Sequence, residues 1–568
     1  MTEAATAAGR PARPDRRGWG GAGGWLSASA LVTALTLLPV AALAVMAAGA
    51  SFDLWRHLAV NVLPAALPTT ALLLAGVGVL VVVIGTGAAW LVTAYEFPGR
   101  RVLDWALLLP LAVPTYVVAF AYLDLLHPIG PVQTVLRDIL GIADPRDLRL
   151  PDIRSLTGGI LLFALVLYPY VYLATRAMFL MQAAGFIEAA RTLGAGRRRV
   201  FFRIALPLAR PAIAVGASLA LMETLNDIGA SQFLGLHTLT VSVYATWVNR
   251  SDLAGAAALA LSMLVIVVLL VGLERRGRRQ RRFAAPTQRT HAPARRPLAR
   301  SRGWLALAAG TLPVLLGFAV PAAYLVSAAA GRIGFAGISA ELVRETGNTV
   351  AVSAVATVVA IVLGLAVAYA ARLDSGRAGA GLARAASLGY ALPGTVLAIG
   401  LLVPLAALDN MVDGASRALV GISTGLMVSG TVAALIYAYA ARFMAVAIGG
   451  AEAGFDKVPR SLDQSARTLG RTAAGTLFGV HLPLIRPALA AAAILVFVDC
   501  MKELPATLLL RPLNFETLAT HLYGEAARGT YEDGAVAALA IVVAGLAPVI
   551  LLARLSRSAI RANGRLVP

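Results

Sequence analysis

The sequence predicts an all-α polytopic membrane protein, and three observations support this fold class. The chain has 568 residues, of which 59% are hydrophobic, and its mean hydropathy is +0.77. Apolar runs of about 20 residues recur along it, and each is long enough to cross about 30 Å of hydrocarbon as a helix. One polar segment between these runs occurs twice. A soluble core cannot absorb so much apolar surface, so the chain is predicted to lie in a membrane.

Twelve apolar runs are long enough to be transmembrane helices, six in each half of the chain. They lie at 25–48, 68–95, 103–126, 156–181, 209–232, 252–273, 303–329, 347–371, 384–408, 417–446, 486–508 and 533–553. The run at 417–446 is longer than one crossing requires, so eleven to thirteen crossings are expected. The first run follows an arginine-rich tail and is too long for the apolar region of a signal peptide, so it is expected to be retained.

The formal net charge of +20 is concentrated in four clusters of arginine. They are Arg10 to Arg17, Arg197 to Arg203, Arg275 to Arg302 and Arg554 to Arg565. With twelve crossings and the N-terminus inside, all four face the cytoplasm, as the positive-inside rule requires. Membrane topology therefore accounts for the charge, and a nucleic-acid partner is not expected. Both termini are predicted to be cytoplasmic, with lipid around the helices.

The single cysteine, Cys500, is predicted to lie inside a membrane helix. It excludes a disulfide framework and a multi-cysteine metal site within the chain. The six histidines are scattered with no pair at ligand spacing, so a permanent zinc or haem site is not expected.

The duplicated segment is the most informative pattern in the chain. The first loop, 188–211, reads EAARTLGAGRRRVFFRIALPLARP, and the second loop, 464–487, reads QSARTLGRTAAGTLFGVHLPLIRP. They align without a gap, and 464 − 188 gives an offset of 276 residues. Each predicts a helix that a glycine ends, Gly194 or Gly470, because glycine permits a left-handed turn. A second amphipathic stretch then leads into the next crossing. Matched loops of this kind favour docking to a partner outside the bilayer.

The repeat divides the chain into two halves. The predicted boundaries are 1–273 for the first half, 274–302 for a basic cytoplasmic linker and 303–568 for the second half. The linker is expected to be a solvated tether and not a packed element. Gly85 corresponds to Gly364 in the second crossing of each six-helix set. Halves of six crossings in the same order are parallel repeats, which places a pathway between them.

Four carboxylates are predicted at membrane depth in related positions of the two halves: Glu223, Asp227, Asp499 and Glu503. A carboxylate there costs several kcal/mol unless it faces a cavity or a partner. We expect these four to flank the central pathway. The alternative is that Asp227 or Glu503 pairs with a nearby charge such as Lys502, or lies near the outer mouth and only holds helices together. Pro114 and Pro393 either bend their helices to open the pathway or form ordinary kinks.

Tyrosines gather in both halves, and two interpretations apply to them. They are Tyr168, Tyr170, Tyr172, Tyr437 and Tyr439. A phenolate oxygen suits Fe³⁺, but tyrosines also form the aromatic belts at membrane surfaces. We expect the belt.

The repeated loop resembles the EAA loop of ABC importer permeases. Glu188, Ala189, Ala190, Gly194, Ile204, Leu206 and Pro207 match that pattern fully. The second loop has Gln464, Ser465, Ala466, Gly470, Val480 and Pro483 at these positions. The second loop departs from the pattern at Gln464, Ser465 and Val480. These departures predict that the two docking loops are unequal. The resemblance implies two tandem type I importer repeats in a bacterial inner membrane, whose loops couple to ATP-binding subunits.

The chain is not expected to hydrolyse ATP itself. A Walker A loop needs lysine after glycine and beside serine or threonine. The two lysines, Lys457 and Lys502, stand in FDKVP and CMKEL. The chain is therefore predicted to be a non-catalytic permease subunit with no cofactor of its own. A separate ATPase dimer, which binds ATP and Mg²⁺, is expected to drive transport.

The whole chain resembles the fused two-domain permeases of ferric iron importers. The stretches that carry the resemblance are 167–179, 222–247 and 499–523, of which the last reads DCMKELPATLLLRPLNFETLATHLY. The resemblance implies a solute-binding protein that delivers Fe³⁺ to the outer loops, including 235–250 and 511–529. Fused permeases for thiamine or phosphonates share the architecture and remain alternatives. An ion-coupled secondary transporter is the rival from another class, and a membrane enzyme lacks a visible catalytic constellation.

Overall fold

The computed structural model describes residues 22–148, 150–181, 190, 192–279, 295–374 and 376–564. Within these ranges, eleven helices are long and apolar enough to cross a membrane, or twelve if one bent pair counts as a single span. The predicted all-α polytopic class is confirmed, and the number of spans falls within the expected range.

The first half contains helices on both sides of the first loop. Their bounds are α1 Ala22–Ala48, α2 Phe52–His57, α3 Leu63–Ala94, α4 Arg100–Ala106, α5 Thr115–Leu125, α6 Pro131–Leu140, α7 Leu156–Met181, α9 Arg197–Val200, α10 Leu206–Asn226, α11 Ile228–Phe233, α12 Leu239–Val248 and α13 Leu253–Arg279.

The second half repeats this order from α16 onward. Its helices are α14 Arg300–Val314, α15 Val320–Ala336, α16 Ala340–Leu373, α17 Ala378–Ala386, α18 Gly394–Val420, α19 Val432–Phe455, α20 Arg460–Thr468, α21 Ala473–Thr476, α22 Leu482–Met501, α23 Pro505–Leu510, α24 Leu518–Arg528 and α25 Tyr531–Gly564. The described residues also form two short strands, β1 Tyr95–Glu96 and β2 Arg296–Pro297, and six short 3₁₀- or π-helical segments.

Matched hydrogen bonds show that the two halves fold alike. The backbone N–H of Leu239 donates to the hydroxyl of Thr70 at 2.9 Å. The N–H of Leu518 donates to the hydroxyl of Thr349 at 2.8 Å. Both donors and both acceptors are 279 residues apart (518 − 239 and 349 − 70). The duplication in sequence is therefore a duplication in structure, down to individual side chains.

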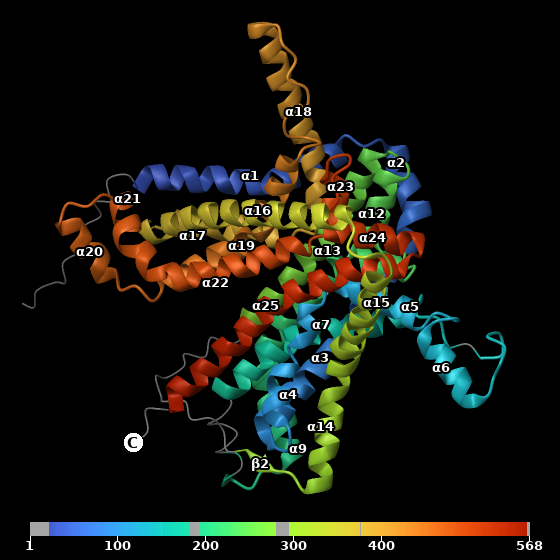
Figure 1. The fold of residues 1–568 in the computed structure, drawn as a ribbon. Coiled ribbons are helices and arrows are strands. Elements are labelled where there is room, and N and C mark those ends of the chain that lie inside the picture. The colour runs from blue at the N-terminus through green and yellow to red at the C-terminus, as the bar shows by residue number, and fades with distance from the viewer. Residues whose placement is uncertain are drawn as a thin grey trace, which may run out of the picture.

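The halves exchange their outer helices. Helix α1 of the first half packs against α16, α17 and α18 of the second. In return, α15 contacts α5, and α25 contacts the helical turn Leu109–Ala112 of the first half. Figure 1 shows two bundles, one with α16, α19 and α22 and the other with α3 and α7, which diverge toward the ends that carry α20 and α9. The exchange ties the bundles together away from those ends.

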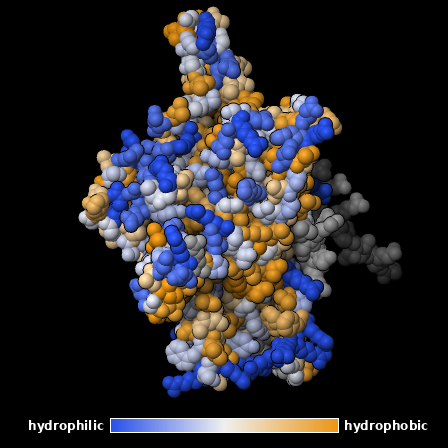
Figure 2. Space-filling view, turned by 90° about the vertical axis from the view of Figure 1, so that its right-hand side faces the viewer, coloured by the Kyte–Doolittle hydropathy of each residue, from blue (hydrophilic) through white to orange (hydrophobic). Residues whose placement is uncertain are grey.

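Apolar side chains cover the outer surface of the bundles. Val79 and Val83 on α3, and Val355, Val358 and Val362 on α16, are all largely exposed. Figure 2 shows broad apolar areas above a strongly polar lower end. A surface of this kind suits a bilayer, whose tails are as apolar as the side chains they contact.

Several predicted crossings are interrupted in the structure, among them 209–232 at Asp227, 384–408 before Gly394 and 486–508 between Met501 and Pro505. Two others differ further. The run 103–126 is not one straight helix: α4 with its following turn meets α5 at an angle of 90°. Pro114 explains the break, because it cannot donate a backbone hydrogen bond and disfavours a helical conformation in the residue before it. The run 417–446 also divides, since α18 ends at Val420 and α19 begins only at Val432. Gly421, with φ of +74°, ends α18.

Part of the predicted linker is packed, contrary to expectation. Arg296 and Pro297 form β2 and pair in parallel with Tyr95 and Glu96 of β1. Helix α13 continues to Arg279, and α14 already begins at Arg300. The carboxylate of Glu96 also lies 3.0 Å from Nε of Arg100. Composition suggested a solvated tether, but backbone pairing holds its C-terminal end against the first half. Residues 280–294 lie outside the described residues.

Gly85 marks a close crossing of α3 and α7, and its replacement by alanine is expected to destabilise the protein. A Cβ at Gly85 would lie 2.7 Å from that of Val171 and 2.8 Å from the carbonyl oxygen of Tyr168. Overpacking of this kind costs about 1–3 kcal/mol. Gly87→Ala in the same helix is the control, because its Cβ meets nothing within 4 Å. Thermal unfolding in detergent measures both, and equal stability of the two variants would contradict the close crossing.

Candidate functional site

A cavity lies where the two halves meet, and four helix breaks surround it. It is lined by Pro114, Thr115, Tyr116, Tyr170, Glu223, Asn226, Asp227, Tyr390, Arg442, Asp499, Lys502, Glu503, Leu504 and Pro505, with five apolar neighbours. We call it the central cavity. Its volume is about 90 Å³, and one water needs roughly 10–15 Å³ by the same measure. It therefore has room for several waters or for a small hydrated solute.

The breaks recur in both halves because the sequence places helix-starting residues there. Pro114 and Pro393 precede α5 and α18 with nearly identical backbone angles, φ of −58° and −57°. Asp227 ends α10 and caps α11, because its carboxylate accepts from the N–H of Ala230 at 2.8 Å. Glu503 accepts from Ala506 at 3.2 Å near the start of α23. The prolines are therefore helix starts at the cavity and not mid-helix kinks.

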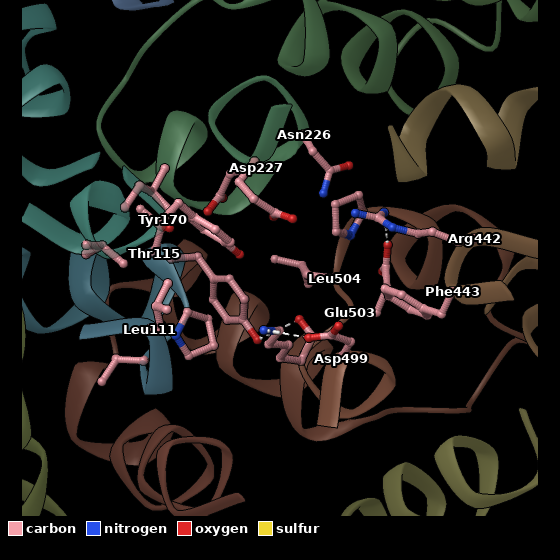
Figure 3. A pocket seen from close by; sticks show the side chains of 18 of the residues that line it. Leu111, Thr115, Tyr170, Asn226, Asp227, Arg442, Phe443, Asp499, Glu503 and Leu504 are labelled. Carbon is pink, nitrogen blue, oxygen red and sulfur yellow. Dashed lines mark hydrogen bonds and ion pairs between the residues drawn. The ribbon is translucent and has the colours of Figure 1, made fainter. Parts of the chain in front are cut away.

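Two of the four predicted carboxylates are paired with cations. Asp499 lies 2.8 Å from Nζ of Lys502, and Glu503 lies 2.5 Å from Nη1 of Arg442. Figure 3 shows the second pair on one side of the cavity, with Asp227 across from it. The side chains of Arg442 and Glu503 are 9% and 1% exposed, so their charges are almost fully removed from solvent. Pairing offsets much of that cost.

Glu223 and Asp227 form no ion pair with any other described residue. Four carboxylates face two cations, so the lining carries two formal negative charges in excess. Asp227 binds backbone, and Glu223 is 3.5 Å from the hydroxyl of Tyr390. Among the described residues, no group of three or more His, Cys, Asp or Glu is arranged to hold a metal ion.

Contacts across the cavity join the halves. The amide N–H of Gly394 donates to the side-chain oxygen of Asn226 at 2.7 Å, and the hydroxyl of Tyr116 donates to the carbonyl of Lys502 at 3.3 Å. A neighbouring contact links Tyr523 to Gln232 at 2.6 Å. Movement of the halves must break or shift these contacts.

Sequence reasoning missed Arg442 and misread most of the tyrosines. Arg442 is the single charged residue in an apolar stretch at 430–451, and that isolation was the available signal. Tyr168, Tyr172 and Tyr439 are at most 2% exposed, and Tyr170 lines the cavity. The aromatic-belt expectation is therefore wrong for these four. Tertiary packing places them inside the protein, which hydropathy alone does not reveal.

The second loop has the predicted helix–turn–helix shape, with α20 before the turn and α21 after it, and the described part of the first loop has the same turn. Gly194 and Gly470 adopt φ of +81° and +74°. The N–H after each glycine donates to the carbonyl five residues earlier, Ala195 to Ala190 at 2.9 Å and Arg471 to Ala466 at 3.0 Å. This is a Schellman turn, and its left-handed residue explains the glycine. Pro207 and Pro483 stand in the first turn of α10 and α22.

The tips of both loops present an exposed leucine. Leu193 is 87% exposed and Leu469 is 79% exposed. Gln464 and Ser465 are also exposed, whereas Ala190 and Ala466 are buried under the loop, and Ile204 and Val480 are half-buried. Glu188 and Ala189 lie outside the described residues. Large apolar side chains held out at matched positions indicate contact surfaces, and nothing in the sequence alone had singled them out.

The segments expected to receive a binding protein are more buried than predicted. Segment 235–250 forms α12, whose Leu239 and Val243 are fully buried. Segment 511–529 forms α24, in which Leu518 and Leu522 are fully buried. Helix α12 contacts α3, α13 and α18, and α24 contacts α11, α16 and α25. The more exposed elements are α6 and the end of α18, which extend from the body in Figure 1.

The fold, the duplication and the paired loops define a class of transport protein, and comparison with known families agrees. Residues 81–279 and 360–561 each match the family described as "Binding-protein-dependent transport system inner membrane component". The two matches cover most of the chain, and each includes one repeated loop. The protein belongs to this family, with two family domains fused in one multi-pass membrane chain.

Three curated relatives show the range of solutes in the family. The chain is 23% identical over 490 residues to the Fe(3+)-transport system permease protein FbpB 2 of Haemophilus influenzae, covering 86% of this chain and 89% of that protein. It is 34% identical over 187 residues to the molybdenum transport system permease protein ModB of Escherichia coli K12, covering 32% and 78%. It is 27% identical to a putative 2-aminoethylphosphonate permease protein, PhnU, of Salmonella choleraesuis, covering 34% and 67%.

Proposed function

We propose that this chain is the membrane permease of an ATP-driven importer for ferric iron. The observation that carries the substrate assignment is the excess of acidic over basic side chains in the central cavity, where neither Glu223 nor Asp227 forms an ion pair with a described residue. A trivalent cation is stabilised by such carboxylates, and oxygen ligands suit it. The similarity to a ferric iron permease along both halves supports the same assignment.

The partners follow from the loops and the family. A separate ATPase dimer would bind the tips at Leu193 and Leu469, one subunit at each loop. A solute-binding protein would deliver iron on the opposite side, where α6 and the end of α18 extend. Both termini and the linker would then be cytoplasmic, which places the arginine clusters inside as the positive-inside rule requires.

Transport would follow from a shift between two arrangements of the halves. ATP-driven closure of the ATPase dimer would draw the two loops together and turn the bundles about their shared contacts. The contacts between Gly394 and Asn226 and between Tyr116 and Lys502 would then give way on the outer side. Hydrolysis would restore the first arrangement. ATP drives the cycle only through its different affinity for the two states.

An anionic solute such as a phosphonate is the second candidate, and a specific observation favours it. Lys502 and Arg442 both line the cavity, and several family members are named for oxyanion or phosphonate transport. Both cations are already neutralised by carboxylates, however, at 2.8 Å and 2.5 Å. Because Lys502 and Arg442 are both neutralised, we prefer a cationic solute to an anionic one.

Uptake of radiolabelled solutes in a strain that lacks this chain tests the proposal. We expect ferric iron uptake to be lost and then restored by the chain together with its ATPase and binding protein. Molybdate, 2-aminoethylphosphonate and thiamine are the matched competitors. An ATPase with an inactivated Walker lysine is the control for coupling, because an ion-coupled transporter would continue to work with it. Unchanged iron uptake with loss of another solute would overturn the assignment.

A further inference from the structure

A buried polar cluster lies directly beneath the second loop. It consists of Asp463, Arg372 and His481, and we call it the Asp463 cluster. One carboxylate oxygen of Asp463 is 2.7 Å from Nη2 of Arg372, and the other is 2.5 Å from Nε2 of His481. His481 is fully buried, and the Arg372 side chain is 9% exposed. Such a cluster is held by charge-assisted hydrogen bonds, which are shorter and stronger than neutral ones.

The protonation of Asp463 follows from its neighbours. Burial alone would raise the pKa of the Asp463 carboxyl, but hydrogen bonds from His481 and Arg372 hold that pKa below its usual range. An ionised carboxylate only accepts hydrogen bonds, so His481 donates from Nε2. The cluster is therefore a carboxylate held between two donors.

The Asp463 cluster joins the loop helix to three other elements. Asp463 lies on α20, whose C-terminal part belongs to the second loop. Arg372 lies at the end of α16. The guanidinium of Arg372 also donates to the carbonyls of Phe455 at 2.7 Å and Val458 at 3.0 Å, where the chain leaves α19. His481 precedes α22. The ends of α16, α19 and α22 are thus connected to α20 by side-chain hydrogen bonds.

Aromatic rings surround the cluster and extend it to the other half of the protein. The rings of Tyr369 and Phe455 lie 5.5 Å and 5.6 Å from that of His481. The hydroxyl of Tyr369 donates to the carbonyl of Ala473 at 2.7 Å, on the far side of the loop turn. Trp25 of α1 packs edge-on against Tyr369 at 5.1 Å. The second loop is therefore braced by α1, a helix that begins the first half.

The first half keeps the aromatic part of this arrangement and lacks the polar part. Trp90 and Phe179 stand at the positions of Tyr369 and Phe455, and their rings pack at 5.4 Å. The positions of Arg372, Asp463 and His481 are occupied by Thr93, Ile187 and Ala205. The hydroxyl of Thr93 donates to the carbonyl of Ala89 in its own helix, and Ile187 lies outside the described residues. None of these three can form the ion pair.

We propose that Asp463, Arg372 and His481 are positioning residues that hold the second loop helix rigidly to the membrane bundle, so that the two coupling sites are mechanically unequal. The inference rests on the proposed coupling function of the loops. The second loop has Gln464 where the first loop has a glutamate, so its contact with the ATPase has one charge fewer. A more rigid attachment of α20 to the membrane helices compensates for this weaker contact. Force from the ATPase would reach α16, α19 and α22 through this cluster.

Hydrogen exchange of residues 460–468 in the importer complex tests the attachment directly. Asp463→Asn is expected to accelerate amide exchange in α20 by roughly tenfold or more, because local opening no longer breaks a charge-assisted bond. Asp104→Asn is the matched control. Asp104 also forms a partly buried pair, 2.6 Å from Arg176, but it joins α4 and α7 and does not contact α20. Unchanged exchange in Asp463→Asn would overturn the proposal whatever the transported solute.

A coupling measurement on the same complexes separates this proposal from the proposed function. With iron-loaded binding protein in liposomes, Asp463→Asn is expected to lower solute transported per ATP hydrolysed by roughly tenfold, with the ATPase still bound. Faster exchange with unchanged coupling would show that the helix is held but does not transmit force, which contradicts the coupling role of the loop.

A triple variant covers the case in which Asp463→Asn fails to fold. Arg372→Thr, Asp463→Ile and His481→Ala together install the residues of the first half, and no buried charge is left unpaired. Replacing a whole buried polar group by apolar residues is often tolerated. We expect this variant to fold and bind ATPase, to exchange faster in α20 and to couple poorly. Exchange and coupling at wild-type values would overturn the proposal.

Discussion

Replacing Arg442 with methionine is expected to destabilise the protein by about 3–5 kcal/mol, the usual cost of removing one partner of a buried ion pair. The change leaves the Glu503 carboxylate uncompensated, and that side chain is only 1% exposed. Arg442 also bridges α19 to the helix break before α23, so the central cavity would loosen with it. Thermal or denaturant unfolding in detergent measures the loss.

The double variant Arg442→Met with Glu503→Gln is the informative control. It removes both charges, and we expect it to regain most of the lost stability, because the penalty comes from the unpaired charge and not from the lost attraction. If the single and double variants are equally unstable, Arg442 acts through packing, for which its position 5.4 Å from the Phe443 ring offers a route.

Replacing Glu223 with glutamine and Asp227 with asparagine together is expected to reduce ferric iron uptake by at least about tenfold. Two charges near a cation in a partly dry cavity are each worth several kcal/mol by Coulomb's law at an effective dielectric constant of about 20, and 1.4 kcal/mol already changes a rate tenfold. Neither carboxylate has a cation to leave unpaired, so folding should survive. Initial rates of radiolabelled uptake, normalised to protein in the membrane, provide the measurement.

The control for that variant is Glu341→Gln, which removes one carboxylate from an exposed surface pair with Arg344. It should leave uptake unchanged, since exposed pairs contribute little. Phosphonate uptake that rises in the double variant, with iron uptake unaffected, would reverse the assignment toward an anionic solute.

Much of the fold was predictable because membrane solvation acts locally. A span must satisfy its backbone internally and present apolar side chains to lipid, so length and hydropathy reveal it. The breaks were harder to predict. Pro114 and Asp227 are visible in the sequence, yet a proline in an apolar run suits a kinked crossing as well as a helix start. The 90° turn at Pro114 depends on what α25 and α15 pack against.

The candidate site was predictable in position and not in pairing. The repeat identified Glu223, Asp227, Asp499 and Glu503 as equivalent, and all four line the central cavity. Which of them is neutralised depends on Lys502 and on Arg442, 61 residues from Glu503 in sequence. No local rule connects residues so far apart. The Asp463 cluster is likewise assembled from three segments that a single sequence does not bring together.

The order of residues alone established a duplicated, helical membrane protein with matched glycine-ended loops, because spans, caps and repeats are short-range properties. Tertiary packing determined the rest: the exchange of outer helices between halves, the interior position of most tyrosines, the partners of the buried charges and the assembly of the Asp463 cluster. These depend on which helix faces meet, and that is set by the summed contacts of distant segments and not by any one of them.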